Sequence, residues 1–378
     1  MHLTFLIYSY FPYGGQQRDF LRIVTECLQR GHQVTVYTRS WQGEIPDQLD
    51  VRLVSAKALT RLGVYRRFTQ WVVEALDRQP TDLVVGFNKM PHLDVYFAAD
   101  PCFAAKAQTQ RGFYYRFTER YKHFMTYEAA VFQADAPTQV LLLSPQQRRD
   151  FSYYYPGCES RLHDLPPGIA TDRKVLNRDP TVRQQFRSEF GISEDTQLIL
   201  QVGSGFRVKG VDRALQAIAA LPAPQRRRCR YLLVGQDRPN RFLRLARKLG
   251  ISDRFDVLPG RDDIPRFFAG ADLLLHPAYQ ESAGYVLLEA TIAGLPVLTT
   301  ATCGYAFHIE QAQSGQVCSE PFSQSELNQR LAAMLEALPT APWSENGLNY
   351  GKNEVLYTLP QAAVDLIEQQ AREKRRAG

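Results

Sequence analysis

Several features are scarce or missing in this sequence, and each absence excludes a class of protein. No C-x-x-C pair occurs among the six cysteines, which lie at positions 27, 102, 158, 229, 303 and 318. This scattered spacing argues against a zinc site and a disulfide framework, and it is typical of a reducing cytoplasm. No apolar run reaches the ~18 residues that a membrane-spanning helix needs, and no repeat or low-complexity tract is visible.

Charge and length set broad limits on the class of protein. The net charge of +6 permits anionic partners but does not indicate nucleic acid, because a mildly basic surface is common in soluble proteins. A chain of 378 residues is long for one hydrophobic core, so two domains are expected. Residues 3–10 are apolar but have neither a basic leader nor a cleavage site, so we expect a first strand rather than a signal peptide.

Apolar strand-like segments alternate with helical patterns through both halves of the chain, which predicts the α/β class. The expected strands are residues 3–8, 34–38, 51–55, 83–87, 95–99 and 140–143 in the first half, the last of these closing its sheet, and 197–202, 231–234, 255–258, 272–276 and 297–299 in the second half. Between the halves, the stiff segment Leu165-Pro-Pro-Gly-Ile169 indicates a domain boundary. We therefore expect domains at residues 1–165 and 166–355, followed by a C-terminal helix at 356–378.

A glycine pair, Gly14-Gly15, lies in the 11–16 loop between the first strand and a predicted helix at residues 17–30. A dinucleotide-binding turn would need the spacing G-x-G-x-x-G, which is missing. The second strand also ends at Thr38-Arg39-Ser40, without the acid that binds an adenosine ribose. A dinucleotide cofactor is therefore disfavoured. The pair either forms a plain tight turn or lets the backbone approach a sugar or phosphate closely.

The stretch from His276 to Thr299 carries the strongest functional signal. An apolar strand ends at His276, a loop contains Glu281 and Gly284, and an amphipathic helix with Glu289 follows. On one continuous helix, two glutamates at this spacing would point about 80° apart and lie ~12 Å apart along the axis. A loop position for Glu281 brings both carboxylates to one ligand more readily. Because a helix start offers free N–H groups to a phosphate and carboxylates accept hydrogen bonds from hydroxyls, the stretch predicts a nucleotide-sugar site.

The spacing of Glu281 and Glu289, with Ala-Gly-Leu-Pro-Val after them, resembles the E-x7-E motif of retaining GT-B glycosyltransferases of family 4. The similarity runs nearly from end to end and includes the segments Phe11-Pro-Tyr-Gly14-Gly15-x-Gln17-Arg-Asp19-Phe, Val85-Gly-Phe-Asn-Lys-Met-Pro91, Leu93-Asp-Val-Tyr-Phe-Ala-Ala-Asp100 and Leu165-Pro-Pro-Gly-Ile169. It implies a GT-B fold, in which two Rossmann-like β/α/β domains face each other across a cleft. The N-terminal domain would bind the acceptor and the C-terminal domain the nucleotide sugar, and the last helix would cross back to the N-terminal domain.

The resemblance implies a retaining hexosyltransferase that moves glucose from UDP-glucose to an inner-core heptose of lipopolysaccharide in α-1,3 linkage. The expected partners are UDP-glucose, the lipopolysaccharide acceptor and an anionic membrane surface, and no nucleic acid. The expected location is cytoplasmic, peripheral on the inner face of the inner membrane. Two alternatives stay open: the same site with another UDP-hexose or a UDP-N-acetylhexosamine, and a non-catalytic module that binds nucleotide sugar or lipid.

The family also implies roles for individual residues. The expected donor-binding residues are Gly15, Arg173, Arg207, Lys209, Arg261, Glu281, Ala283, Gly284 and Glu289. Glu289 would bind the ribose hydroxyls, and Glu281 would bind the hexose hydroxyls and fix the ring for attack. The Ala283-Gly284 amides and Lys209 would bind the diphosphate, on which charge builds as the glycosidic bond breaks.

The turn after residues 197–202 departs from the family in one position. It reads Gly203-Ser-Gly-Phe-Arg207-Val-Lys209-Gly210, whereas the family pattern is G-R-x-x-x-x-K-G. Ser204 occupies the arginine position, which leaves Arg207 as a candidate substitute. The alternative for Arg207 and Lys209 is a pair of exposed loop cations. Arg261 would lie near the uracil, and its alternative is a surface ion pair.

The predicted catalytic residues are Asp100, Asp19 and Glu281, with both aspartates near the acceptor hydroxyl. Asp100 ends a predicted strand, where ligands of open α/β sheets bind, although a turn former or helix cap is the alternative. Retention permits a covalent glycosyl-enzyme or same-face attack in which the leaving phosphate takes the proton. We favour same-face attack because the sequence does not identify a nucleophilic residue. No D-x-D triplet occurs, so neither a metal nor another cofactor is expected.

Residues 103–132 combine nine aromatic residues and five cations with only two acids. The rings at 113, 117, 121 and 124 have helical spacing, with Arg116 and Arg120 on a neighbouring stripe. This pattern is typical of an interfacial helix with its rings at lipid headgroups, and Arg116, Arg120 and Lys122 are the candidate membrane contacts. The alternative is an ordinary domain helix whose rings lie in the core while the cations reach the surface.

Overall fold

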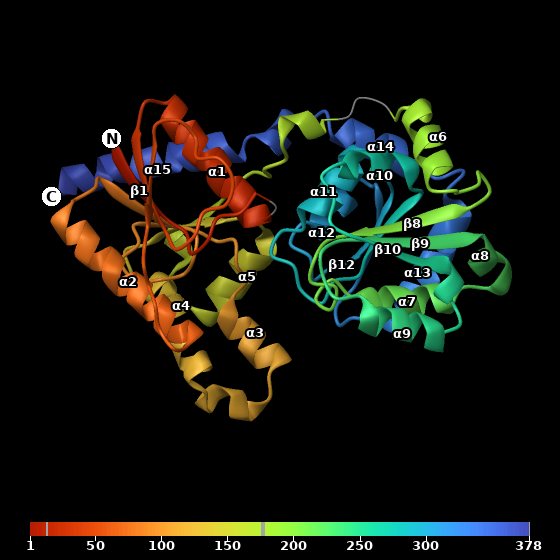
Figure 1. Cartoon of the computed structure of the whole chain (residues 1–378), viewed down its shortest axis with the longest axis horizontal. Helices are drawn as coiled ribbons and strands as arrows, with labels where there is room; N and C mark the ends of the chain where they lie inside the picture. The colour runs from red at the N-terminus through yellow and green to blue at the C-terminus, as the bar shows by residue number, and fades with distance from the viewer. Residues whose placement is uncertain (13, 175–177, 378) are drawn as a thin grey trace. The chain divides into compact units, whose positions relative to one another are not determined.

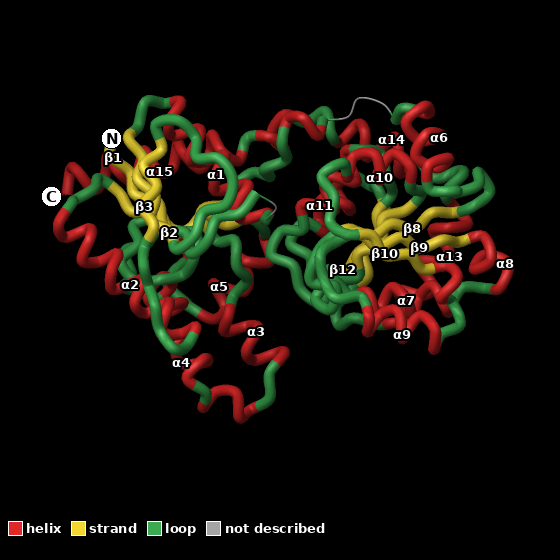
Figure 2. Tube along the Cα trace, viewed as in Figure 1, coloured by secondary structure: helices red, strands yellow, loops and turns green. Residues whose placement is uncertain are grey.

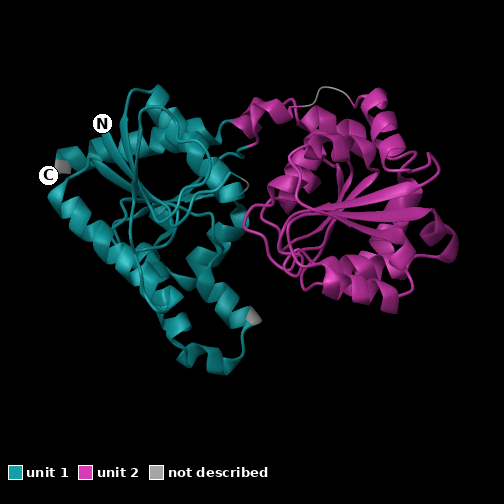
Figure 3. Cartoon of the chain, viewed as in Figure 1, with its two compact units in different colours: residues 1–168, 358–378 teal, residues 169–357 magenta. Residues whose placement is uncertain are grey.

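The computed structural model describes residues 1–12, 14–174 and 178–377 and divides the chain into two units (Figure 3). Unit 1 holds residues 1–168 and 358–378, and unit 2 holds residues 169–357. Tyr13 of the predicted 11–16 loop lies outside the described residues. Each unit contains one parallel sheet with helices packed on its faces (Figures 1 and 2).

The sheet of unit 1 has the strand order β3-β2-β1-β4-β5-β6-β7, and all neighbouring strands are parallel. Its strands are β1 (His2–Leu6), β2 (Gln33–Thr38), β3 (Leu49–Leu53), β4 (Leu83–Gly86), β5 (Val95–Phe97), β6 (Gln139–Leu142) and β7 (Leu162–Asp164). The central strands are continuous apolar runs because both faces of a parallel sheet are covered. The prediction that residues 140–143 close this sheet is wrong, because β7 pairs with the outer side of β6.

Both chain segments of unit 1, residues 1–168 and 358–378, contribute helices to it. They are α1 (Gly15–Gln29), α2 (Arg61–Arg78), α3 (Phe103–Gln110), η1 (Phe113–Phe117), α4 (Glu119–Phe132), α5 (Pro145–Tyr154), η2 (Glu159–Arg161) and α15 (Leu359–Ala377). The C-terminal helix α15 packs along α1, where Arg30 donates to Asp365 at 2.6 Å. Lys374 pairs with Asp94 at 2.7 Å, so the chain returns to unit 1 after it has formed unit 2.

The rings at 113, 117, 121 and 124, whose spacing predicts one interfacial helix, are divided between η1 and α4, so that prediction is wrong. The hydroxyl of Thr118 accepts the Tyr121 amide hydrogen at 3.2 Å and caps the start of α4, which separates it from η1. Three rings of η1 are exposed, at 66, 84 and 66% for Phe113, Tyr114 and Phe117. The other end of the segment, at the C-terminal turn of α4, lies in the core of unit 1.

Unit 2 has the strand order β10-β9-β8-β11-β12-β13, again with parallel neighbours only. Its strands are β8 (Gln197–Val202), β9 (Cys229–Val234), β10 (Phe255–Leu258), β11 (Leu273–His276), β12 (Val297–Thr300) and β13 (Gly315–Cys318). Its helices are η3 (Thr171–Arg173), α6 (Pro180–Glu189), α7 (Val211–Ala219), α8 (Ala223–Arg228), α9 (Asn240–Lys248), η4 (Ser252–Arg254), α10 (Ile264–Gly270), α11 (Tyr285–Ile292), α12 (Ala306–Gln311), α13 (Gln324–Ala337), α14 (Trp343–Tyr350) and η5 (Glu354–Tyr357). Two Rossmann-like units confirm the predicted α/β class.

The strand order of each sheet reverses at one point, between β1 and β4 in unit 1 and between β8 and β11 in unit 2. Ligands of open α/β sheets bind outside the carboxyl ends of the strands at such a point. The loops that follow β8 and β11, residues 203–210 and 277–284, leave the sheet of unit 2 there. These are the loops that contain Lys209 and Glu281.

Candidate functional site

Lys209 and Glu281 meet beside the reversal point of unit 2. The Lys209 ammonium forms an ion pair with Glu281 Oε2, and the two side chains are only 19% and 18% exposed. His276 Nε2 lies 3.1 Å from the same oxygen. Although burial alone raises it, the hydrogen bond from His276 and the charge of Lys209 lower the pKa of Glu281 to about 2. Glu281 is therefore an anion at neutral pH, and within the described part of the chain its other oxygen, Oε1, makes no hydrogen bond.

Gly210 lets the two loops approach each other. Its φ is +70°, and a Cβ at this position would lie 2.0 Å from the carbonyl oxygen of Pro277. The Tyr279 amide donates to the Val208 carbonyl at 2.8 Å and joins the loops directly. A side chain at position 210 would push the loop of Lys209 away from that of Glu281, so only glycine fits.

Polar side chains of β8 and α7 hold the loops of Lys209 and Glu281 in place. Gln201 is fully buried in β8, donates to the Lys209 carbonyl at 2.7 Å and accepts a hydrogen bond from the Tyr231 hydroxyl. On the other loop, the Arg213 guanidinium lies 3.6 Å from the centre of the Tyr279 ring. The positions of the cation and the carboxylate are therefore set by the backbone of two anchored loops.

Gly284 directly precedes α11 and has a φ of +95°, which a residue with a Cβ rarely adopts. The loop before it is held by the Tyr305 amide, which donates to the Ala283 carbonyl at 2.7 Å, and by the Gly304 amide, which donates to the Glu281 carbonyl at 3.0 Å. Among the described residues, the amides of Ala283 and Gly284 donate no hydrogen bond. Both stay available to an anion, beside the positive end of the α11 dipole.

Glu289 lies in the second turn of α11 and is half-buried. The predicted placement of the two acids, with Glu281 in the loop and Glu289 on the helix, is confirmed. The two carboxylates therefore stand before and after the helix start.

Of the three arginines predicted for the donor site, Arg207 shares the 203–210 loop with Lys209, whereas Arg173 and Arg261 come from other segments of unit 2. Arg261 follows β10 and binds Asp263 through two hydrogen bonds, at 2.7 and 2.8 Å, as its alternative interpretation predicts. Arg207 is exposed, and Arg173 lies 3.9 Å from the carboxylate of the preceding residue. In the described ranges none of the three forms an ion pair with Glu281. Ser204 accepts the Gln236 amide hydrogen at 3.0 Å and so ties the loop to the exit of β9.

The predicted residues of unit 1 lie at the carboxyl side of its sheet. Gly15 starts α1, and Asp19 in the same helix is buried, 4.0 Å from Arg22. Asp100 follows β5 and is exposed. Gln147 donates to the Asp100 carbonyl at 3.4 Å, so the backbone of this residue is anchored while its side chain reaches solvent.

A buried carboxylate fixes the chain that follows Asp100. Glu128 in α4 is fully buried and forms an ion pair with Lys89. It also accepts hydrogen bonds from the amides of Phe103, at 2.6 Å, and Ala104, at 2.8 Å. Glu128 therefore caps α3 from a distance in the sequence and holds the segment next to Asp100.

Sequence reasoning missed two residues that support the Lys209–Glu281 cluster, namely Gln201 and His276. His276 ends a strand that is otherwise apolar and fully buried, and Gln201 directly follows three buried apolar residues of β8. A buried polar side chain needs a hydrogen-bonding partner, and this requirement was the available signal.

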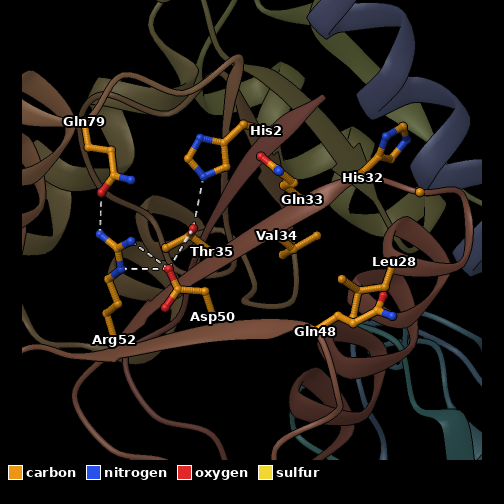
Figure 4. A pocket seen from close by; sticks show the side chains of 11 residues that line it. His2, Leu28, His32, Gln33, Val34, Thr35, Gln48, Asp50, Arg52 and Gln79 are labelled. Carbon is orange, nitrogen blue, oxygen red and sulfur yellow. Dashed lines mark hydrogen bonds and ion pairs between the residues drawn. The ribbon is translucent and has the colours of Figure 1, made fainter.

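A half-open groove of about 480 Å³ lies at the opposite, amino-terminal ends of the strands of unit 1 (Figure 4). Its polar side chains bond to one another: His2 Nε2 lies 3.0 Å from the Thr35 hydroxyl, and Arg52 donates to Asp50 at 2.8 Å. Ligands of open α/β sheets bind at the carboxyl ends, so we do not assign the functional site to this groove.

Within the described residues, no group of three His, Cys, Asp or Glu side chains is placed to hold a metal ion. Of the helices that the structure describes, none combines the length and apolar character needed to cross a membrane.

Two Rossmann-like units, with a cation, a carboxylate and open amides at the reversal point of the second, define a glycosyltransferase of the GT-B class. Residues 13–173 match the family profile described as Glycosyltransferase Family 4, and residues 182–347 match that of Glycosyl transferases group 1.

Individual relatives give the same result. The chain is 47% identical to the lipopolysaccharide glucosyltransferase WaaG of Escherichia coli (strain K12) over 97% of this chain and 98% of that protein. The crystal structure of WaaG, a glycosyltransferase involved in lipopolysaccharide biosynthesis, matches with a TM-score of 0.91 over 97% of this chain and 99% of the other. Anabaena Alr3699/HepE in complex with UDP-glucose shares the fold, with a TM-score of 0.73 at 18% identity over 98% of this chain and 100% of the other. The chain belongs to the group 1, family 4 glycosyltransferases, as its sequence resemblance implied.

Proposed function

We propose that this glycosyltransferase moves glucose from UDP-glucose to an inner-core heptose of lipopolysaccharide, in α-1,3 linkage and with retention of configuration. The observation that carries the proposal is the mostly buried Lys209–Glu281 pair beside the open amides of Ala283 and Gly284. Its groups match the parts of a nucleotide sugar: amides and a cation for the diphosphate, and a carboxylate for hydroxyls. The 47% identity to a lipopolysaccharide glucosyltransferase over nearly the full length supports the choice of sugar and acceptor.

Donor binding divides between these groups. The Lys209 ammonium and the amides of Ala283 and Gly284 hold the diphosphate, and Glu289 accepts hydrogen bonds from the ribose hydroxyls. Glu281 accepts a hexose hydroxyl at Oε1 while its Oε2 stays anchored. Lys209 exchanges the carboxylate for the diphosphate, because the diphosphate offers more negative charge to the ammonium than one carboxylate does.

Transfer then proceeds by same-face attack. The acceptor hydroxyl oxygen forms the new bond to the anomeric carbon while the bond from that carbon to the β-phosphate oxygen breaks. The hydroxyl proton passes to the departing diphosphate oxygen, so UDP leaves with the proton and the α configuration is kept. Lys209 stabilises the charge that develops on the diphosphate. On the acceptor side we assign Asp100, whose side chain is exposed after β5, together with Asp19.

The same proposal places the enzyme on the inner face of the inner membrane. The exposed rings of Phe113, Tyr114 and Phe117 and the exposed cations Arg116 and Arg120 occupy one short segment of unit 1. Rings and cations in this combination bind the boundary of an anionic bilayer, with the rings at the headgroups. The acceptor, a membrane glycolipid, would then be reached without a membrane-spanning helix.

A donor panel tests the proposed reaction. Purified enzyme is incubated with a heptose-terminated core acceptor and labelled UDP-glucose, UDP-galactose or UDP-N-acetylglucosamine, and the linkage of the product is determined. We expect transfer from UDP-glucose at a rate at least about tenfold above the others, since a buried polar group left without its hydroxyl partner costs about 1–3 kcal/mol. Preferred transfer of another sugar would favour the alternative donor, and donor binding without any transfer would favour the non-catalytic module.

A further inference from the structure

His276 is a histidine that the reaction described above does not use. It ends β11, its side chain is completely buried, and its Nε2 lies 3.1 Å from Glu281 Oε2. Its other nitrogen, Nδ1, has no hydrogen-bonding partner among the described residues. A buried nitrogen without a hydrogen-bonding partner requires a reason.

The protonation of the ring follows from its surroundings. Burial lowers the pKa of His276 below its ordinary value, so the ring is neutral at neutral pH. A neutral imidazole carries one N–H, and the Glu281 carboxylate can only accept. The hydrogen therefore lies on Nε2 and Nδ1 is a bare acceptor. Cys303 is also buried nearby, and burial raises its pKa to about 11, so it stays an uncharged thiol.

The backbone of His276 is held on both sides. Strand β11 lies between β8 and β12 in the sheet, and the Thr299 hydroxyl donates to the His276 carbonyl at 2.9 Å. The loop of Glu281 is fastened separately, since the Glu281 amide donates to the Thr302 carbonyl at 3.2 Å. The imidazole is thus a fixed, uncharged donor aimed at one oxygen of a fixed loop.

Both Lys209 and His276 bind the same oxygen of Glu281. In the proposed donor complex, Lys209 turns to the diphosphate and leaves this oxygen. We propose that His276 is a positioning residue, which then holds Glu281 Oε2 alone and keeps Oε1 directed at the hexose hydroxyls. The inference rests on the proposed function and deepens it, because it assigns the group that keeps the sugar-binding acid in place after the lysine has moved.

Two substitutions of similar size separate the hydrogen bond from packing. His276→Leu removes the donor, whereas His276→Gln keeps an N–H at a similar distance from the backbone. We expect His276→Leu to lower kcat with UDP-glucose by about 10- to 100-fold, the usual effect of losing a hydrogen bond to a charged group. The affinity for UDP should change by less than about threefold, because UDP lacks the hexose that Glu281 contacts. His276→Gln should recover most of kcat.

The pH profile gives a second measurement that a purely structural role would not change. Without the histidine donor, the pKa of Glu281 in the donor complex rises, so an acidic limb of kcat should move to higher pH in His276→Leu but not in His276→Gln. As a control, His308→Leu removes another buried histidine of unit 2, whose ring bonds to the Tyr350 hydroxyl at 2.6 Å rather than to an acid. This control should lower the melting temperature without moving that limb.

The possible outcomes distinguish the positioning role of His276 from the proposed glucose transfer. Wild-type kcat in His276→Leu would overturn the positioning role, as would an equal loss in the Leu and Gln variants that follows the folded fraction. Failure of the wild-type enzyme to transfer glucose would instead contradict the proposed function. UDP affinity, measured by calorimetry, would still report whether the variants keep the diphosphate site.

Discussion

Lys209 and Glu281 are 72 positions apart in the chain, yet their side chains form an ion pair in which both are more than four-fifths buried. Each comes from a loop at the point where the strand order of unit 2 reverses, and Gly210 allows the backbones to touch. Removing one partner of a mostly buried pair leaves an uncompensated charge. In the proposed donor complex, the diphosphate replaces the carboxylate as the partner of Lys209.

The first prediction concerns this pair. Lys209→Ala and Glu281→Ala should each lower turnover with UDP-glucose by about 100-fold or more, because the first removes the cation on the leaving group and the second the ligand of the hexose. Circular dichroism should show an unchanged fold. Lys209→Ala should weaken UDP binding, whereas Glu281→Ala should affect UDP binding less. Near-wild-type rates in both variants would remove the donor site from this cluster.

The second prediction concerns the turn before α11. At Gly284, with φ +95°, a Cβ would lie 3.2 Å from Glu281 Cγ. Gly284→Ala should lower stability by about 1–2 kcal/mol through backbone strain and should also lower turnover by displacing the acid. Gly191→Ala is the matched control, since Gly191 has φ +61° in the same unit and open space around it. It should show a similar loss in urea unfolding with normal kinetics; equal kinetics in both variants would refute the close fit at Gly284.

The third prediction concerns divalent metal. Because Lys209 and helix-start amides are assigned to the diphosphate, glucose transfer should continue in the presence of EDTA at a rate within about twofold of the untreated enzyme. Addition of Mg²⁺ or Mn²⁺ should not raise it further. Loss of activity in EDTA that either ion restores would show that a metal takes the part assigned to Lys209.

The fourth prediction concerns the exposed rings and cations of η1 and the start of α4. Replacing Arg116, Arg120 and Lys122 together with glutamate should reduce co-flotation with anionic vesicles by tenfold or more. Each cation near such a surface contributes about 1 kcal/mol to binding. A matched control places glutamates at Arg241, Arg244 and Lys248, which are exposed on α9 of unit 2. This control makes the same change in net charge away from the exposed rings of η1. Equal losses in both triple variants would mean that only overall charge matters.

The fifth prediction concerns pH and stability. Burial lowers the pKa of His308 to about 4, whereas an unfolded histidine titrates near 6.5. Between these values the unfolded state binds more protons, so the free energy of unfolding falls as pH drops through this window, by up to about 3 kcal/mol. His308→Leu should lose less stability between pH 7 and pH 4.5 in urea unfolding. Parallel curves for the variant and the wild type would contradict a neutral buried His308.

Much of the fold could be predicted because strands of a parallel sheet are short apolar runs between helices. The strand β7 was missed because Leu162–Asp164 is only three residues long and partly polar. The break at Thr118 was also missed, although a threonine three residues before Tyr121 carries the sequence signal of a helix cap. The helical spacing of the rings on both sides of Thr118 predicts a helix through this residue, and the capping signal was not weighed against it.

The candidate site was only partly accessible to sequence reasoning. Glu281, Gly284 and Glu289 lie close together in the chain, so their local spacing predicts a loop followed by a helix. The contact of Lys209 with Glu281 depends on the pairing of β8 with β11, which no local pattern determines. The role of Gln201 is hidden for the same reason, because its partners come from the following loop and from β9.

The most direct test of the account is a crystal structure of this protein with UDP bound. The account predicts the β-phosphate within hydrogen-bonding distance of the Ala283 and Gly284 amides, with the Lys209 ammonium moved from Glu281 to the diphosphate and His276 still bonded to Glu281. A diphosphate bound away from the start of α11, with the Lys209–Glu281 ion pair intact, would contradict it.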